Sequence, residues 1–131
     1  MYEKATAYIE KIENLSEDEI IPIVHHFQER PSKQIMGRNQ GTMYEYNPML
    51  WECLNKWSED HFVKTVWDET KTMRKEDFSS DEWLDNLTEH QANLTLSWLV
   101  SNEDYHRGTL ADWVKNGTLV RVLKRLEEAD A

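Results

Sequence analysis

Apolar residues recur every three or four positions along most of this chain, and that spacing predicts amphipathic helices. The pattern is clearest in the C-terminal third, where Leu110, Trp113 and Val114 fall on one helical face. Asn116-Gly117 follows as a C-cap pair, and a last helix is expected to begin at Thr118. The apolar positions of that helix are Leu119, Val122, Leu123 and Leu126.

Two helices are expected in the N-terminal part. The first spans Tyr2–Asn14 and has an apolar stripe. The second begins at a capping box, in which Ser16 and Glu19 can each bond the other's backbone N–H, and ends before Pro31. Its apolar residues are Ile20, Ile23, Val24 and Phe27.

The middle of the chain is less periodic. Residues 31–46 have the composition of a loop with room for a short strand. A helix is expected from Asn47 as N-cap and Pro48 as first helical residue. Residues 61–75 fit either a short strand or a helix.

These elements predict an all-α, helix-dominated fold. Ser79 or Ser80 is expected to cap a helical turn, and Thr88 to open a longer helix. The expected architecture is a compact single-domain bundle spanning 1–131, with about five to seven helices and room for a short strand pair in 31–75.

Composition fits a protein with a packed core. The single cysteine, Cys53, excludes an intramolecular disulfide and lies beside apolar neighbours, which favours a small core residue over a reactive thiolate. No stretch approaches the roughly 20 apolar residues that cross a bilayer, and the N-terminus lacks a signal-peptide pattern. A cytoplasmic location is therefore expected.

Four segments near the C-terminus form a recognisable pattern: Leu94–Val100, Asp104–Leu110, Asn116–Leu119 and Val122–Leu126. They contain an apolar helix, an aromatic turn with a glycine, and a final helix that ends in Arg-Leu. With this pattern, residues 46–126 resemble DUF6508, a family of uncharacterised bacterial proteins.

One departure from the family pattern concerns charge. The resemblance implies arginines at the positions of Ser101 and Asp104, and this chain has neither. Any anion binding by those arginines in relatives is therefore not expected here. Since the family has no assigned activity, the resemblance implies a fold and no function.

Charge is the most unusual feature of the sequence. The chain has 25 acidic and 15 basic residues, a formal net charge of −10. This argues against non-specific binding to nucleic acid or to anionic membranes. Between Glu76 and His106 there is no Lys or Arg. The acidic residues of that segment are Glu76, Asp77, Asp81, Glu82, Asp85, Glu89, Glu103 and Asp104.

Four of these acids recur every three or four residues within Asp81–Ser101, a spacing that lines them along one helical face. One interpretation is a solvated face with acids near a helix N-terminus. The other is an anionic stripe that docks on a basic protein surface, so Glu76, Asp77, Asp81, Glu82, Asp85 and Glu89 are candidate partner-binding residues.

The six tryptophans can also be interpreted in two ways, as core residues or as binding residues. Trp51, Trp83, Trp98 and Trp113 fall on apolar stripes, which favours core packing over a ring-stacking pocket. Trp67 is the best candidate for an exposed aromatic residue and joins the candidate partner-binding residues as an interface anchor.

A metal site is the main alternative. In the helix expected there, His25 and Glu29 share one face beside His26, and His61 can supply a further ligand. The sequence has no zinc signature, and ordinary polar positions explain these residues equally well. No cofactor is therefore predicted.

The residues thus favour a non-catalytic interaction module that binds a basic protein. A special case is a phage or mobile-element inhibitor of a nucleic-acid-binding enzyme. The alternatives are a small metal-dependent enzyme that uses His25, His26, Glu29 and His61, and an oligomerising helical protein with an apolar patch around Trp67.

Overall fold

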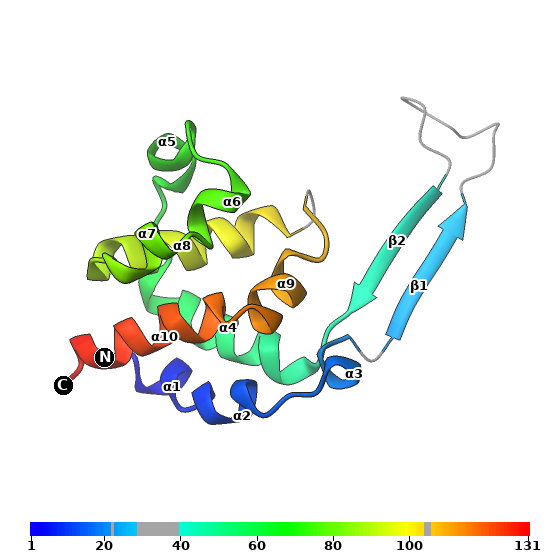
Figure 1. Ribbon diagram of the computed structural model, residues 1–131, viewed down its shortest axis with the longest axis horizontal. Coiled ribbons are helices and arrows are strands. Elements are labelled where there is room, and N and C mark those ends of the chain that lie inside the picture. The colour runs from blue at the N-terminus through cyan, green and yellow to red at the C-terminus, as the bar shows by residue number, and fades with distance from the viewer. Residues whose placement is uncertain (22, 29–39, 104–105) are drawn as a thin grey trace.

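A computed structural model describes residues 1–21, 23–28, 40–103 and 106–131, with the backbone alone in 23–28 and 40–44. Helices dominate the described chain, and two strands form one antiparallel hairpin (Figure 1). The elements are α1 (Glu3–Thr6), α2 (Ile9–Glu13), α3 (Glu17–Ile20), β1 (Ile23–Gln28), β2 (Gln40–Glu45), α4 (Pro48–His61), α5 (Val66–Thr70), α6 (Lys75–Phe78), α7 (Asp81–Asp85), α8 (Glu89–Asn102), α9 (Thr109–Lys115) and α10 (Thr118–Ala129).

Helix α8 forms the centre of the fold. Its residues from Leu94 to Leu99 are all buried, so it is enclosed on every side. It packs against α4, α5 and α10. Helix α10 instead buries one face, with Leu119, Val122 and Leu123 in the core and its charged residues outside. The helix-dominated prediction is confirmed, with more helical segments in the described residues than the five to seven expected.

Helix starts agree well with the capping residues of the sequence. Ser16 and Glu19 form the predicted capping box of α3, and Thr88 forms another with Gln91 at α8. Asn47 caps α4, where its Oδ1 accepts a hydrogen bond 3.1 Å from the Met49 backbone nitrogen. These local signals place helix starts because each satisfies backbone N–H groups that lack an intrahelical partner.

The helix predicted up to Pro31 is wrong. Helix α3 ends at Ile20 and the chain enters β1, which pairs with β2 from Ile23 opposite Glu45 to Gln28 opposite Gln40. Ile21 has φ −125° and ψ 84°, as expected for a residue before proline, where the α conformation is disfavoured. The β-branched residues that follow then favour a strand. Only β2 lies within the 31–75 window expected for a strand pair.

Two other segments differ from, or complete, the predictions. The helix expected over Tyr2–Asn14 is divided into α1 and α2 by a turn at residues 7–8. Residues 61–75, which fitted strand or helix, contain α5 and the start of α6. No helix among the described residues is long and apolar enough to span a membrane.

The hairpin projects from one end of the helical body, beside α3 and the start of α4 (Figure 1). Since α4 has 14 residues, its other end lies about 20 Å away along the helix. This geometry separates the hairpin from the end of α4 that carries His61.

Candidate functional site

Helices α6 and α7 place acidic side chains at a surface pocket of about 460 Å³. Asp77 and Glu82 are exposed. One oxygen of Asp77, Oδ2, accepts a hydrogen bond from the Arg74 backbone nitrogen at 2.8 Å, which fixes the carboxylate at the start of α6. The pocket thus presents two carboxylates to solvent. Its lining residues are Asp77, Ser80, Glu82, Trp83, Asn86 and Gln91.

The aromatic wall of this pocket is Trp83. Ser80 caps α7 by accepting a hydrogen bond from the Trp83 backbone nitrogen at 3.2 Å. The indole Nε1 donates to Thr95 Oγ1 of α8 at 2.9 Å, and the ring lies edge-on to Phe78 with centroids 5.7 Å apart. Because both ends of the side chain are held, the half-buried ring is a rigid surface beside the two carboxylates.

Two of the predicted partner-binding acids already have an internal partner. Arg121 of α10 donates to Asp81 Oδ1 at 2.9 Å and to Asp85 Oδ1 at 2.5 Å. The two carboxylate side chains remain 87% and 67% exposed, so this ion pair contributes little stability. It does show that this surface is shaped to hold a guanidinium group between carboxylates.

Glu89 does not belong to the same surface. Its Oε1 accepts a hydrogen bond from the Tyr2 hydroxyl at 2.8 Å, and Asn93 Nδ2 donates to that hydroxyl at 2.9 Å. Glu89 therefore holds the N-terminus against α8. The single acidic face predicted over Asp81–Ser101 is wrong, because residues 86–88 separate α7 from α8.

Of the remaining acids of this segment, Glu103 is buried and Glu76 is exposed. Glu76 is exposed on α6 but lines a different depression, with Lys75 and Asp112 as neighbours. Asp104 lies outside the described residues. Of the acids predicted to bind a partner, the structure therefore brings Asp77 and Glu82 together with an aromatic ring.

Trp67 is exposed, as predicted, with 56% of its surface accessible. Val66 and Thr70 face the core, so Trp67 lies on the outer side of α5. Lys64 and Lys71, three residues before and four after it, are exposed as well. Trp67 does not line the Trp83 pocket, and its exposed neighbours carry both signs of charge, since Asp68 and Glu69 follow it on α5.

The candidate metal ligands are distributed over separate elements. His25 and His26 lie in β1, and Glu29 is outside the described residues. His61 ends α4, where its Nε2 lies 3.2 Å from the Met1 carbonyl oxygen and its ring 4.4 Å from that of Tyr2. Figure 1 shows β1 at the opposite end of α4, so the structure does not bring His61 to His25 and His26.

No group of three or more His, Cys, Asp or Glu residues in the described part of the chain is arranged to hold a metal ion. Cys53 is buried, and its Sγ lies 3.4 Å from the Ala5 carbonyl oxygen. Burial raises the pKa of the Cys53 thiol to about 12. The thiol is thus a core group, as predicted.

A buried carboxylate, Glu103, was not singled out by the sequence. Its Oε1 accepts hydrogen bonds from the Tyr46 hydroxyl and, at 3.0 Å, from the Gly108 backbone nitrogen. Its Oε2 accepts one from the Leu110 backbone nitrogen at 3.1 Å. Gly108 has φ +94° and precedes α9, so Glu103 caps that helix in place of a residue at its own N-terminus. The resulting network joins β2–α4, α8 and α9.

Burial raises the pKa of Glu103, while these three donors oppose the shift. Burial and the neighbouring Glu103 also raise the pKa of Tyr46. The arrangement has no open face to solvent, since both residues are buried. We assign it a structural role.

The Tyr46 pKa gives a pH-dependent prediction. The folded state holds the Tyr46 proton more tightly than the unfolded chain, so the free energy of unfolding should fall as pH rises above the ordinary tyrosine pKa of about 10. Urea unfolding of the protein and of Tyr46→Phe from pH 8 to 11 checks this. The stability difference between them should be constant up to about pH 9 and should shrink above pH 10. A constant difference throughout would contradict the assignment.

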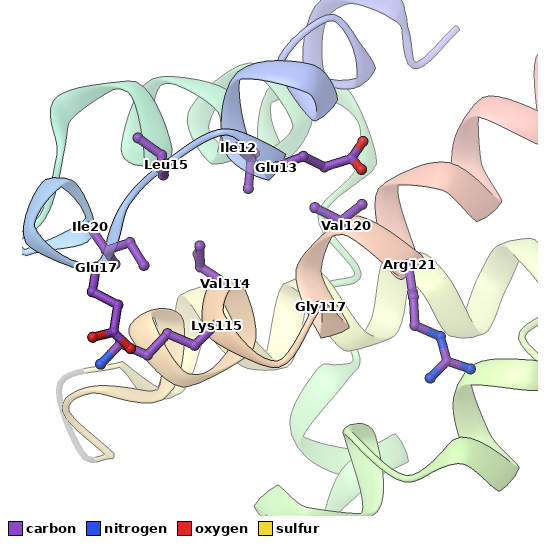
Figure 2. Close-up of a pocket in the computed structure, with 10 residues that line it drawn as sticks. All are labelled: Ile12, Glu13, Leu15, Glu17, Ile20, Val114, Lys115, Gly117, Val120 and Arg121. Atoms are coloured by element: carbon purple, nitrogen blue, oxygen red, sulfur yellow. The ribbon is translucent and has the colours of Figure 1, made fainter.

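A second depression lies between α2–α3 and α9–α10 (Figure 2). It has a volume of about 440 Å³, and its inner surface includes Ile12, Ile20 and Val120. Two charged residues at its rim are engaged elsewhere: Glu13 lies 3.6 Å from the Lys124 ammonium, and Arg121 reaches α7. Glu17 and Lys115 line the groove as well, so it combines apolar and charged residues, and it shares Arg121 with the ion pairs of α7.

The chain matches the sequence model of a family described as a family of unknown function, DUF6508, over residues 8–130. The match extends through most of the N-terminal 45 residues, which the resemblance recognised in the sequence left uncovered. No curated protein and no solved structure matches the chain.

Proposed function

This chain belongs to DUF6508, a family of unknown function, and we propose that it is a non-catalytic interaction module that binds a basic protein surface. The observation that supports the proposal most is the pocket in which Asp77 and Glu82 lie beside the Trp83 ring. A lysine or arginine side chain of a partner can meet two carboxylates and an aromatic ring there at once.

The surroundings of the pocket favour such a partner. Asp81 and Asp85 adjoin it on α7 and carry more negative charge than Arg121 neutralises. A cationic partner is attracted by this field before contact, and the attraction weakens as salt rises. Binding then depends on the pocket, where the half-buried ring excludes part of the water.

The proposal extends to a special case that the overall charge favours. An enzyme that binds nucleic acid has a cationic channel, and a protein with net charge −10 can compete for it. The chain is then an inhibitor of the kind encoded by phages or mobile elements. The acidic α6–α7 surface would occupy the channel in place of phosphates.

A titration with a short arginine-rich peptide tests the pocket directly. The Trp83 indole N–H resonance should shift more than those of the buried Trp57 and Trp113, and 0.5 M salt should suppress the shift. Substituting Asp77→Asn with Glu82→Gln should weaken peptide binding about tenfold, because two charge-assisted contacts are lost.

The matched control is Glu127→Gln with Glu128→Gln, which removes two exposed carboxylates from the end of α10. This variant has the same net charge as the pocket variant. Equal weakening in both variants would show that only net charge matters and would contradict a specific role for the pocket.

A further inference from the structure

Three lysines from different helices line one pocket, which is therefore positively charged although the protein as a whole is acidic. Lys4 of α1, Lys11 of α2 and Lys56 of α4 surround a depression of about 520 Å³. The other lining residues are Ala7, Tyr8 and Glu59. Helix α1 packs against α4, which brings Lys56 to the two lysines that precede it by about 50 positions.

Tyr8 organises these lysines. The Lys11 and Lys56 ammonium groups lie 5.5 Å and 5.2 Å from the centre of its ring, within the range of cation–π attraction. Lys56 Nζ also donates a hydrogen bond to the Tyr8 hydroxyl at 2.9 Å and lies 3.3 Å from Glu52. Tyr8 itself is 8% exposed, so its position is fixed by the core.

The charges of this pocket are incompletely balanced. Its lining contains three ammonium groups and one carboxylate, Glu59, and a second carboxylate, Glu52, lies 3.3 Å from the Lys56 ammonium, so one positive charge remains in excess. Lys4 and Lys11 are exposed, and within the described part of the chain neither lies at ion-pair distance from a carboxylate. Like charges held close together repel each other, and an anion between them relieves the repulsion.

We infer that this pocket binds a compact anion that carries a phosphate group, either inorganic phosphate or a small phosphomonoester. Two exposed ammonium groups, Lys4 and Lys11, beside the fixed ammonium of Lys56 suit an anion with several acceptor oxygens and a charge near −2. The buried Tyr8 ring leaves little aromatic surface for a nucleotide base to stack on. The net charge of −10 disfavours extended polyanions, which must contact much more of the surface.

The site lies on α1, α2 and α4 and shares no residue with the Trp83 pocket. Its test is therefore independent of the proposed function. Sodium phosphate, glycerol phosphate and sodium chloride are titrated at equal ionic strength into the ¹⁵N-labelled protein. Either phosphate compound should shift the amide signals of residues 4–11 and 52–59, while chloride should not; the tighter of the two identifies the source of the phosphate group.

The variant Lys4→Gln with Lys11→Gln leaves the Lys56 contacts with Tyr8 and Glu52 intact, and both substituted side chains are exposed, so folding should be unaffected. Phosphate binding should weaken about tenfold or more, since two of three ammonium groups are lost. The control is Lys64→Gln with Lys71→Gln, two exposed lysines on either side of Trp67, which should bind phosphate as the parent does. Identical shifts with chloride and phosphate, or equal phosphate affinity of the Lys4–Lys11 variant and the parent, would overturn the inference.

Discussion

Replacing Trp113 with alanine is expected to lower the free energy of unfolding by about 3–5 kcal/mol. The side chain is 1% exposed, and its ring stacks on that of Trp98 with centroids 5.9 Å apart and planes at 18°. Phe78 contacts the same ring from α6, with centroids 6.2 Å apart. Removing the indole leaves a cavity between α6, α8 and α9 that these aromatic neighbours cannot fill without changing their own packing.

Trp113→Phe is the matched variant. Among the described residues, Trp113 Nε1 is a buried nitrogen without a hydrogen-bond partner, so phenylalanine loses no bond there. We expect it to cost clearly less than alanine, about 1–2 kcal/mol for the smaller ring. Urea denaturation followed by far-ultraviolet circular dichroism measures both. A loss near zero for Trp113→Ala would contradict the packing of α9 described above.

Glu103→Ala should destabilise the fold by about 3 kcal/mol or more, because it leaves several buried donors without their acceptor. The Tyr46 hydroxyl and the backbone N–H groups of Gly108 and Leu110 all donate to this carboxylate. Each buried donor left unsatisfied costs about 1–3 kcal/mol. The loss should be largest where α9 begins, which hydrogen exchange of residues 108–112 can resolve.

Two further variants separate the parts of this network. Glu103→Gln keeps one acceptor oxygen and should cost less than alanine. Tyr46→Phe removes one donor and leaves the two backbone donors satisfied, so its cost should be about 1 kcal/mol. Glu127→Ala on the exposed end of α10 is the control for loss of a glutamate. If Glu103→Ala were no more destabilising than Glu127→Ala, the structural role of Glu103 would be wrong.

Much of the helical fold could be predicted because its signals are local. The caps at Ser16, Asn47 and Thr88 depend on residues within one helical turn, and all three occur in the structure. The apolar stripe that contains Trp113 is equally local, and its burial is confirmed. The strand β1 was missed because Ile23 and Val24 fit both a helical stripe and a strand. These residues form a strand because they pair with β2, which begins only at Gln40, beyond the range of a helical pattern.

The candidate site was only partly predictable for the same reason. The cluster of acidic residues is visible in the sequence, but the ion pair of Arg121 with Asp81 and Asp85 joins residues about 40 positions apart. The buried role of Glu103 depends on Tyr46, which is 57 positions away. The sequence shows these acids only as neighbours along the chain. The fold places Glu103 in the core, pairs Asp81 and Asp85 with Arg121, and brings Asp77 and Glu82 to the pocket.

We propose that the Asp77–Glu82–Trp83 pocket binds a basic protein. The most direct test is affinity capture from lysate of the cells that make the protein, at low and high salt, with the Asp77→Asn/Glu82→Gln and Glu127→Gln/Glu128→Gln variants in parallel. We expect the parent and the α10 variant to retain a basic protein at low salt and to release it at high salt. The pocket variant should fail to retain that protein. Retention of the same proteins by the pocket variant, or none by the parent at either salt, would contradict the proposal.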